Sequence, residues 1–301
     1  GALIASSILS ARALAPLEQI VSGWRQIAMA RAAFANLSGL LSEAEVREQT
    51  TKLPVPRGHL RLEHIGLRGP PGQPAILRGI SFLVEPGQIL GIVGTSGAGK
   101  STLARVITGA QRPDVGIVRI DGASLTDWDA DELGPHIGYL PQDVALFAGT
   151  VAENICRFAG SDPVARSAAI VAAAKAAGAH QMILALPKGY DTMLGTSGRG
   201  VSLGQAQRIG LARALYGEPA VLVLDEPNAH LDAAGEAALF EALKVAQARG
   251  AASVVIAHRA GVLRIADRIA VLTDGTIESV GPRDQVIQQR LTPLRSAVAG
   301  E

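Results

Sequence analysis

Cysteine is almost absent from this sequence of 301 residues. The single residue, Cys156, excludes a disulfide within the chain and a zinc site built from several cysteines, which is typical of a protein in a reducing compartment. No histidine stands near Cys156 in the sequence, so nothing indicates a cysteine nucleophile. We expect its thiol to be a small buried side chain.

The chain also has almost no net charge. Its 28 Lys and Arg residues against 27 Asp and Glu residues leave a formal charge of +1, and no basic cluster stands out. A nucleic-acid partner is therefore not expected, because it requires a basic surface. Hydrophobic residues make up 48% of the chain and the mean hydropathy is +0.25, which excludes disorder as the dominant state.

A hydrophobic run long enough to cross a bilayer, about 20 residues, is missing as well. Residues 2–9 are mostly apolar, and the basic residues Arg12 and Arg25 follow this run, whereas a signal peptide carries them before it. Residues 1–50 are interpreted as the cytoplasmic end of a membrane helix with a connecting helix. An amphipathic helix packed on a soluble core is the alternative, and these residues alone favour neither.

Residues 51–58 contain Pro54 and Pro56, and they predict a linker. From residue 59 to about residue 295, short apolar runs alternate with helical stretches, which predicts an α/β domain with a largely parallel sheet. The expected strands lie at residues 60–65, 76–84, 89–93, 117–120, 221–224, 253–256 and 269–272. The pair Asp274-Gly275 predicts a hairpin from the last of these to residues 276–280.

A glycine-rich loop between an expected strand and an expected helix has the pattern of a phosphate-binding loop. Its residues are Gly94, Thr95, Ser96, Gly97, Ala98, Gly99, Lys100 and Ser101. Glycines let backbone N–H groups wrap around phosphates, and the following helix N-terminus adds partial positive charge. Lys100 is expected to neutralise the β- and γ-phosphates, and Ser101 to bind Mg²⁺. A flexible glycine turn is the less favoured alternative.

A second apolar run, at residues 220–224, ends in Asp225-Glu226. Ligands of α/β sheets bind at the carboxyl ends of the strands, which is where these two carboxylates are expected. Asp225 is suited to supporting Mg²⁺ and Glu226 to acting as the base that polarises an attacking water. Alone, such a pair is often only an acidic turn, and the phosphate loop upstream favours the catalytic interpretation.

Residues 201–208, VSLGQAQR, resemble the signature motif of ATP-binding cassette (ABC) proteins, usually written LSGGQ. Gln142 in YLPQD and His258 in IAHR complete the order of cassette motifs from about Arg57 to the C-terminus. The resemblance implies an ATPase with a P-loop NTPase core, in which a mainly parallel sheet has flanking helices. It also implies an antiparallel β subdomain and an α-helical signature subdomain.

The resemblance further implies a head-to-tail dimer with two ATP molecules between the copies. Residues 94–102, Thr102 included, would hold the triphosphate in one copy, while Ser202, Gly204 and Gln205 of the other copy close over the γ-phosphate. The resemblance implies that Asp232 belongs to the same nucleotide site. Gln142 would sense the metal and water at the surface that couples to the membrane domain, and His258 would hold the γ-phosphate. The implied catalytic residues are Glu226, His258 and Lys100, and the implied Mg²⁺ ligands are Ser101, Gln142 and Asp225.

The flanking stretches at residues 12–19, 70–72, 77–82 and 225–232 look like those of type I secretion exporters of the alkaline-protease group. Such an exporter implies an attached membrane domain, a periplasmic adaptor and an outer-membrane channel. Its cargo would be a protein with a C-terminal signal, and its cassette would lie on the cytoplasmic side of a bacterial inner membrane. The alternatives are an exporter of lipid, peptide or small-molecule cargo, and a weakly hydrolysing module that dimerises with ATP.

The sequence departs from the cassette pattern at several positions. Leu203 stands where the signature usually has Gly, and Thr196 where exporters often have Glu. No aromatic residue for adenine stacking is obvious near Gly69, and Ala206 and Ala229 replace a common Arg and Ser. Because Lys100, Asp225, Glu226 and His258 are all kept, hydrolysis remains the favoured activity, with a low turnover expected.

Overall fold

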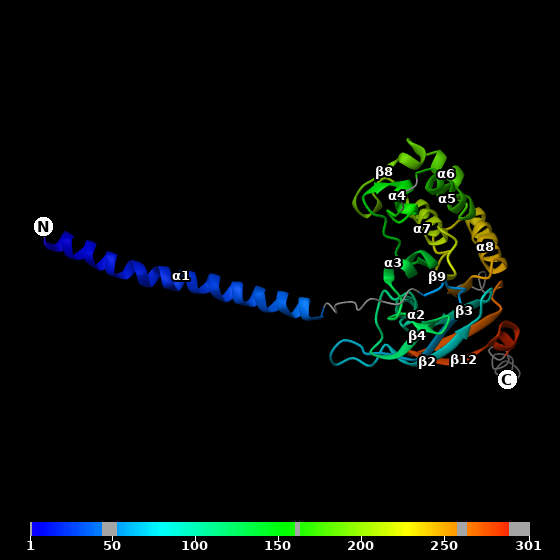
Figure 1. The fold of residues 1–301 in the computed structure, drawn as a ribbon, viewed down its shortest axis with the longest axis horizontal. Helices are drawn as coiled ribbons and strands as arrows, with labels where there is room; N and C mark the ends of the chain where they lie inside the picture. The colour runs from blue at the N-terminus through cyan, green and yellow to red at the C-terminus, as the bar shows by residue number, and fades with distance from the viewer. Residues whose placement is uncertain (1, 44–52, 160–162, 258–263, 289–301) are drawn as a thin grey trace, which may run out of the picture. The chain divides into compact units, whose positions relative to one another are not determined.

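The computed structural model describes residues 2–43, 53–159, 163–257 and 264–288 (Figure 1). The chain divides into two units, residues 1–50 and 51–301. The first unit holds one helix, α1 (Ala2–Glu43), which runs through Pro16 as a single element. Among the described residues, no helix combines the length and apolar character needed to cross a membrane.

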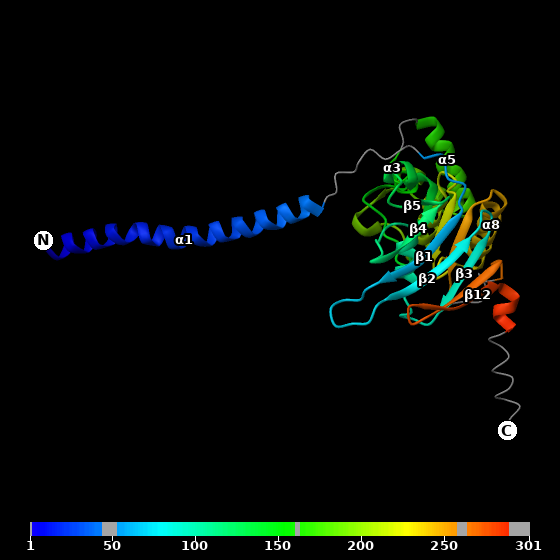
Figure 2. The same cartoon turned by 60° about the horizontal axis from the view of Figure 1, so that its bottom comes forward.

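The second unit contains a four-stranded antiparallel sheet with the strand order β2-β1-β4-β5 (Figure 2). These strands are β1 (Leu60–Leu67), β2 (Leu77–Val84), β4 (Val115–Ile120) and β5 (Ala123–Ser124). Along β1 the residues alternate, so that Leu60 and Leu62 are buried while Arg61 is exposed. Because successive side chains of a strand point to opposite faces, one face of this sheet packs on the core and the other faces solvent.

A six-stranded sheet with the order β12-β11-β3-β10-β9-β6 forms the centre of the same unit. Its strands are β3 (Ile89–Gly94), β6 (Ile137–Leu140), β9 (Val221–Asp225), β10 (Ala252–Ile256), β11 (Arg268–Thr273) and β12 (Thr276–Pro282). All neighbours are parallel except β11 and β12, which form the hairpin predicted at Asp274-Gly275. Both turn residues have positive φ, +47° and +76°, as the preferred two-residue hairpin turn requires.

Helix α2 (Lys100–Ile107) packs its buried face into a core that both sheets share. Leu62 of β1, Leu103 of α2 and Val254 of β10 all belong to that core. Short helical turns follow β5 at α3 (Ala130–Leu133) and η1 (Gly134–His136). The apolar strand runs predicted from the sequence therefore fold as an α/β core with an antiparallel β subdomain, as expected.

A helical subdomain packs around a second core, which includes the buried Cys156. Its elements are α4 (Val151–Ile155), α5 (Pro163–Ala176), α6 (His180–Leu184) and α7 (Leu203–Leu215), with β7 (Gly149–Thr150), β8 (Met193–Leu194), η2 (Gly189–Asp191) and η3 (Thr196–Gly198). Helix α8 (Ala233–Ala248) contacts both α5 and β10. It thereby joins the helical subdomain to the sheet.

Asn154 is fully buried in α4 and fixes the loop that precedes this helix. Its Oδ1 accepts the N–H of Phe147 at 2.8 Å, and its Nδ2 donates to the carbonyls of Phe147 and Thr150 at 2.9 and 3.0 Å. Because Asn154→Ala leaves buried backbone groups without partners, we expect the free energy of unfolding to fall by about 3 kcal/mol. Urea unfolding measures this, with exposed Gln181→Ala as the control, and a change below about 0.5 kcal/mol at Asn154 would contradict the assignment.

Candidate nucleotide-binding site

The carboxyl ends of four neighbouring parallel strands meet at one edge of the central sheet. In the strand register, Ile92 of β3 pairs with Ile256 of β10, and Ile256 pairs with Asp225 of β9. Leu140 of β6 pairs with Leu224 on the other side of β9. The glycine loop that follows β3, the pair Asp225-Glu226 and the segment after β6 are therefore placed at the same edge, where α/β sheets bind ligands.

The glycine loop is shaped by its glycines. A Cβ at Gly94 would lie 2.1 Å from the carbonyl oxygen of Leu272, so only glycine fits where the loop leaves β3. Gly97 and Gly99 have φ of +80° and +96°, in the left-handed region that glycine adopts readily. Gly99 is also the N-cap of α2, so the partial positive charge of this helix N-terminus lies in the loop. The loop is thus a cradle suited to phosphates.

Lys100 is the cation of this loop, and its side chain is only 5% exposed. Its Nζ donates to the carbonyl oxygens of Gly94 and Thr95 at 3.0 and 2.8 Å, which folds the side chain back along the loop. Burial lowers the pKa of Lys100, while the charges of Glu226 and Asp225 act in the opposite direction. The strands thus bring the predicted phosphate-binding cation and both predicted carboxylates together.

Oxygen donors for a divalent cation also gather here. Ser101 Oγ lies 3.4 Å from Oε1 of Gln142, the residue two positions after β6. Asp225 ends β9 with a side chain that is 1% exposed. A hydroxyl, an amide oxygen and a carboxylate are hard ligands that fit Mg²⁺. Within the described residues no group of three or more His, Cys, Asp or Glu side chains could hold a metal ion.

Glu226 directly follows the buried Asp225 and has a φ of +50°, which is uncommon for a residue with a side chain. Its N–H donates to the carbonyl of Ile256 at 3.0 Å, and its own carbonyl accepts the N–H of Ala229 at 3.1 Å. These two bonds fix the backbone where the chain turns away from the sheet. An uncommon backbone conformation that the surrounding hydrogen bonds hold in place is often found at functional sites.

The signature segment caps helix α7. Ser202 is the N-cap, its Oγ accepting the N–H of Gln205 at 3.3 Å, while Gln205 Oε1 accepts the N–H of Ser202 at 2.8 Å. This reciprocal pair is a capping box. A Cβ at Gly204 would lie 3.0 Å from the carbonyl oxygen of His230. Leu203, the departure from the usual glycine, is 72% exposed at the first turn of the helix.

Two side-chain contacts next to the site were not predicted from the sequence. Buried Gln207 donates from Nε2 to the carbonyl of Pro227 at 3.2 Å, and Arg208 donates from Nη2 to Asp232 Oδ1 at 2.5 Å. Both tie α7 to the segment that follows Asp225-Glu226 in the same chain. Nothing in the sequence pairs these positions, because the contacts depend on how α7 packs on β6 and the neighbouring helices.

Asp232 is the N-cap of α8, and its Oδ1 accepts the N–H of Gly235 at 2.8 Å. That N–H and the guanidinium of Arg208 lower the pKa of Asp232. Thr102 is buried in the first turn of α2, where its Oγ1 accepts from Arg105 Nη2 at 3.2 Å. Thr196 lies in η3, and His258 lies outside the described residues. The roles assigned to these residues stay predictions.

A surface groove of about 330 Å³ lies beside Gln142. Its lining residues are Tyr139, Pro141, Ala145, Phe147, Asn154, Arg157, Phe158 and Arg213. Phe147 and Phe158 are 61% and 51% exposed, and their rings meet edge to face with centroids 6.2 Å apart. Exposed aromatic side chains beside a groove are typical of a docking surface.

The edge of this parallel sheet combines a phosphate-binding loop, a cation and two carboxylates. This combination defines the class of P-loop nucleotide-binding proteins. The family model of the ABC transporter matches residues 77–229. The chain belongs to the ABC transporter family, and it is the ATP-binding cassette part. Family membership confirms the predicted use of ATP and agrees with the predicted ATPase class.

Similar proteins indicate which group of ABC transporters the chain resembles. The chain is 47% identical to the type I secretion system ATP-binding protein PrsD of Rhizobium meliloti (strain 1021), over 97% of this chain and 50% of that protein. It is 36% identical to the cyclolysin secretion/processing ATP-binding protein CyaB of Bordetella pertussis, over 100% of this chain and 42% of that protein. The chain thus spans half or less of these relatives, and the predicted resemblance to type I secretion exporters is confirmed.

A solved structure of a bacterial Atm1-family ABC exporter with ATP bound is also similar. It has a TM-score of 0.76 and 28% identity, and the match covers 97% of this chain and 51% of that chain. This agreement confirms the predicted cassette fold. The predicted boundaries at residues 50 and 58 and the membrane-helix interpretation of residues 1–50 stay predictions.

Proposed function

We propose that this chain binds and hydrolyses ATP to power protein export in a type I secretion system. The observation that carries the proposal is the single sheet edge that brings together Lys100, the Ser101–Gln142 pair and Asp225-Glu226. The names of the relatives supply the transported class, since PrsD and CyaB are ATP-binding proteins of secretion systems. Export of lipids, peptides or small molecules is the alternative that those names disfavour.

In the proposed mechanism the loop from Gly94 to Thr102 holds the triphosphate, with backbone N–H groups and Lys100 facing its negative charge. Mg²⁺, when bound by Ser101, Gln142 and Asp225, supplies charge neutralisation of the phosphates. Glu226 accepts a proton from the attacking water. His258 is proposed to hold the γ-phosphate and orient that water.

A second copy of the chain is the proposed partner that completes the site. Ser202, Gly204 and Gln205 form a helix N-terminus whose partial positive charge is suited to a γ-phosphate. ATP would therefore join two incomplete half-sites and favour a head-to-tail dimer. Within one chain, the bonds from Gln207 and Arg208 to residues 227 and 232 tie the signature helix to the segment that follows Asp225-Glu226.

We further propose that the groove beside Gln142 receives the attached membrane domain, since its exposed Phe147 and Phe158 offer apolar contact area close to a predicted metal ligand. The exporter would lie in a bacterial inner membrane with the cassette on the cytoplasmic side. A periplasmic adaptor, an outer-membrane channel and a cargo protein with a C-terminal signal complete the proposed assembly.

The shared-site proposal is tested by the rate of Mg-ATP hydrolysis as a function of protein concentration. Because two copies complete each site, turnover per chain should rise with concentration until the dimer is saturated. Phosphate release and sedimentation velocity, measured on the same samples, should follow one curve. A turnover per chain that is constant while the chain stays monomeric would show a site complete in one copy, and would contradict the proposal.

Leu203 is expected to limit turnover. Its exposed side chain stands at the helix N-terminus proposed to meet the γ-phosphate, so Leu203→Gly should raise kcat by up to about tenfold, equivalent to roughly 1.4 kcal/mol of barrier. Leu184→Gly removes another exposed helical leucine and serves as the matched control. A kcat that is unchanged or lower in Leu203→Gly would assign the slow step elsewhere.

A further inference from the structure

The solvent face of the antiparallel sheet carries an unusual pairing of like charges. Arg61 of β1 stands directly opposite Arg119 of β4 in the strand register. Like charges directly opposite each other destabilise an antiparallel pair. His59 directly precedes β1, and Arg57 lies before Gly58, whose φ of +96° turns the chain away from the extended conformation. Four basic side chains therefore gather at the start of β1 and the end of β4.

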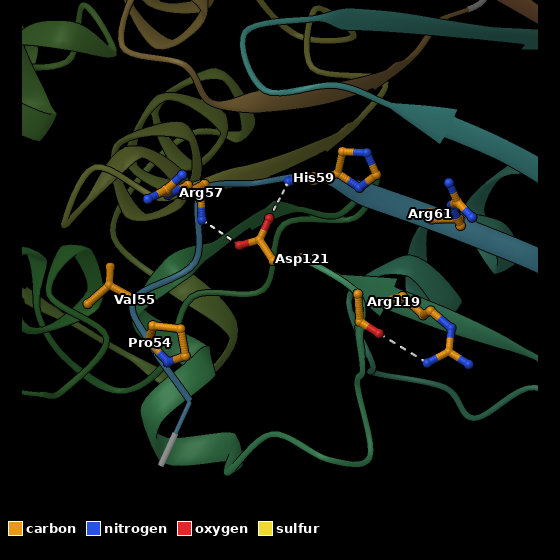
Figure 3. Close-up of a pocket in the computed structure, with 8 residues that line it drawn as sticks. Pro54, Val55, Arg57, His59, Arg61, Arg119 and Asp121 are labelled. Carbon is orange, nitrogen blue, oxygen red and sulfur yellow. Dashed lines mark hydrogen bonds between the residues drawn. The ribbon is translucent and has the colours of Figure 1, made fainter. Parts of the chain in front are cut away.

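These side chains line a cavity of about 680 Å³, a volume in the range of small-molecule sites. Figure 3 shows Arg61 and Arg119 reaching out from their neighbouring strands, with Arg57 on the chain segment across the cavity from them. Pro54 and Val55 add a small apolar wall. Arginine is suited to binding phosphate because its planar guanidinium donates two parallel hydrogen bonds.

Three carboxylates lie beside this group, those of Glu63, Asp121 and Glu85. Glu63 is shared by both arginines, lying 3.2 Å from Arg119 Nε and 3.8 Å from Arg61 Nη1. The two carboxylate oxygens of Asp121 accept the backbone N–H groups of Arg57 and His59 at 2.5 and 2.9 Å (Figure 3). His59 Nε2 lies 3.3 Å from Glu85. Within the described residues Arg57 forms no ion pair, so its guanidinium is available to a ligand in the cavity.

We propose that this cavity is a second anion site, which binds the phosphate group of a phosphorylated ligand between Arg61 and Arg119. A phosphate placed there competes with Glu63, which already contacts both guanidiniums. The site is separate from the nucleotide loop, because the buried residues Leu60 and Leu62 point to the core shared with α2 while the arginines point outward. A free phosphorylated molecule and the headgroup of an anionic phospholipid supply the same chemistry.

The test uses the full chain carrying Lys100→Ala, which removes the cation of the nucleotide loop. Pyrophosphate without Mg²⁺ is titrated by calorimetry, and flotation is measured with vesicles of phosphatidylglycerol and phosphatidylcholine and with vesicles of phosphatidylcholine alone. We expect binding that Arg61→Gln or Arg119→Gln weakens at least about tenfold. Glu63→Gln should strengthen it, because the internal carboxylate no longer competes. Arg249→Gln, at an arginine paired with Glu218, is the matched charge control.

Either probe can support the site. Pyrophosphate binding with this pattern of variants identifies a free ligand, and binding only to the anionic vesicles with the same pattern identifies a lipid headgroup. Absence of binding by both probes overturns the proposal, as does a loss that is equal in Arg249→Gln. Urea unfolding confirms that the variants fold, and Arg61→Gln should not lower the stability, since it removes one of two opposed like charges.

Discussion

Replacement of Glu226 by Gln is expected to reduce ATP turnover by at least about a hundredfold, because a neutral amide cannot accept the proton of the attacking water. The backbone at residue 226, fixed by its bonds to Ile256 and Ala229, does not depend on the carboxylate. ATP binding should therefore persist, and the ATP-bound dimer should accumulate because it is not consumed. Phosphate release measures the first effect and sedimentation velocity with ATP the second.

Glu241→Gln changes a carboxylate on the exposed face of α8, where Glu241 contacts Lys244, and it is the matched control. Its turnover should equal that of the unmodified chain. A Glu226→Gln variant that keeps turnover within about threefold, less than 1 kcal/mol of barrier, would move the base to another residue.

Replacement of Lys100 by Ala is expected to weaken ATP binding by about a hundredfold, the equivalent of a lost charge-assisted contact to phosphate. The charges of Glu226 and Asp225 act on Lys100, and its Nζ donates to the carbonyls of Gly94 and Thr95 at the start of the loop. Loss of the side chain removes both the positive charge and the two hydrogen bonds to the phosphate-binding loop. Calorimetric titration with Mg-ATP measures the change in Kd.

Lys244→Ala is the control for Lys100→Ala, since Lys244 is an exposed cation on α8 that pairs with Glu241. Its Kd for ATP should be unchanged. If Lys100→Ala bound ATP as tightly as the control, the glycine loop would not be the triphosphate site, and the proposed function would lose its central observation.

The amino-acid sequence by itself determined the fold class and most of the candidate site. The apolar runs before Gly94 and Asp225 predicted buried strands, and the glycines between residues 94 and 99 favoured a phosphate loop over a flexible turn. Strand β6 was not predicted, because its four residues, with a glycine among them, are too few to show a hydrophobic pattern.

Only the tertiary structure decided which distant residues meet. Ser101 and Gln142 are 41 positions apart, and they come within 3.4 Å because α2 and the chain after β6 reach the same sheet edge. The pairing of Arg61 with Arg119 likewise follows from the register of β1 and β4. Local patterns specify strands and helices through the spacing of residues along the chain. Strand order and register depend instead on how all the apolar faces are buried together, and they determine which distant residues come into contact.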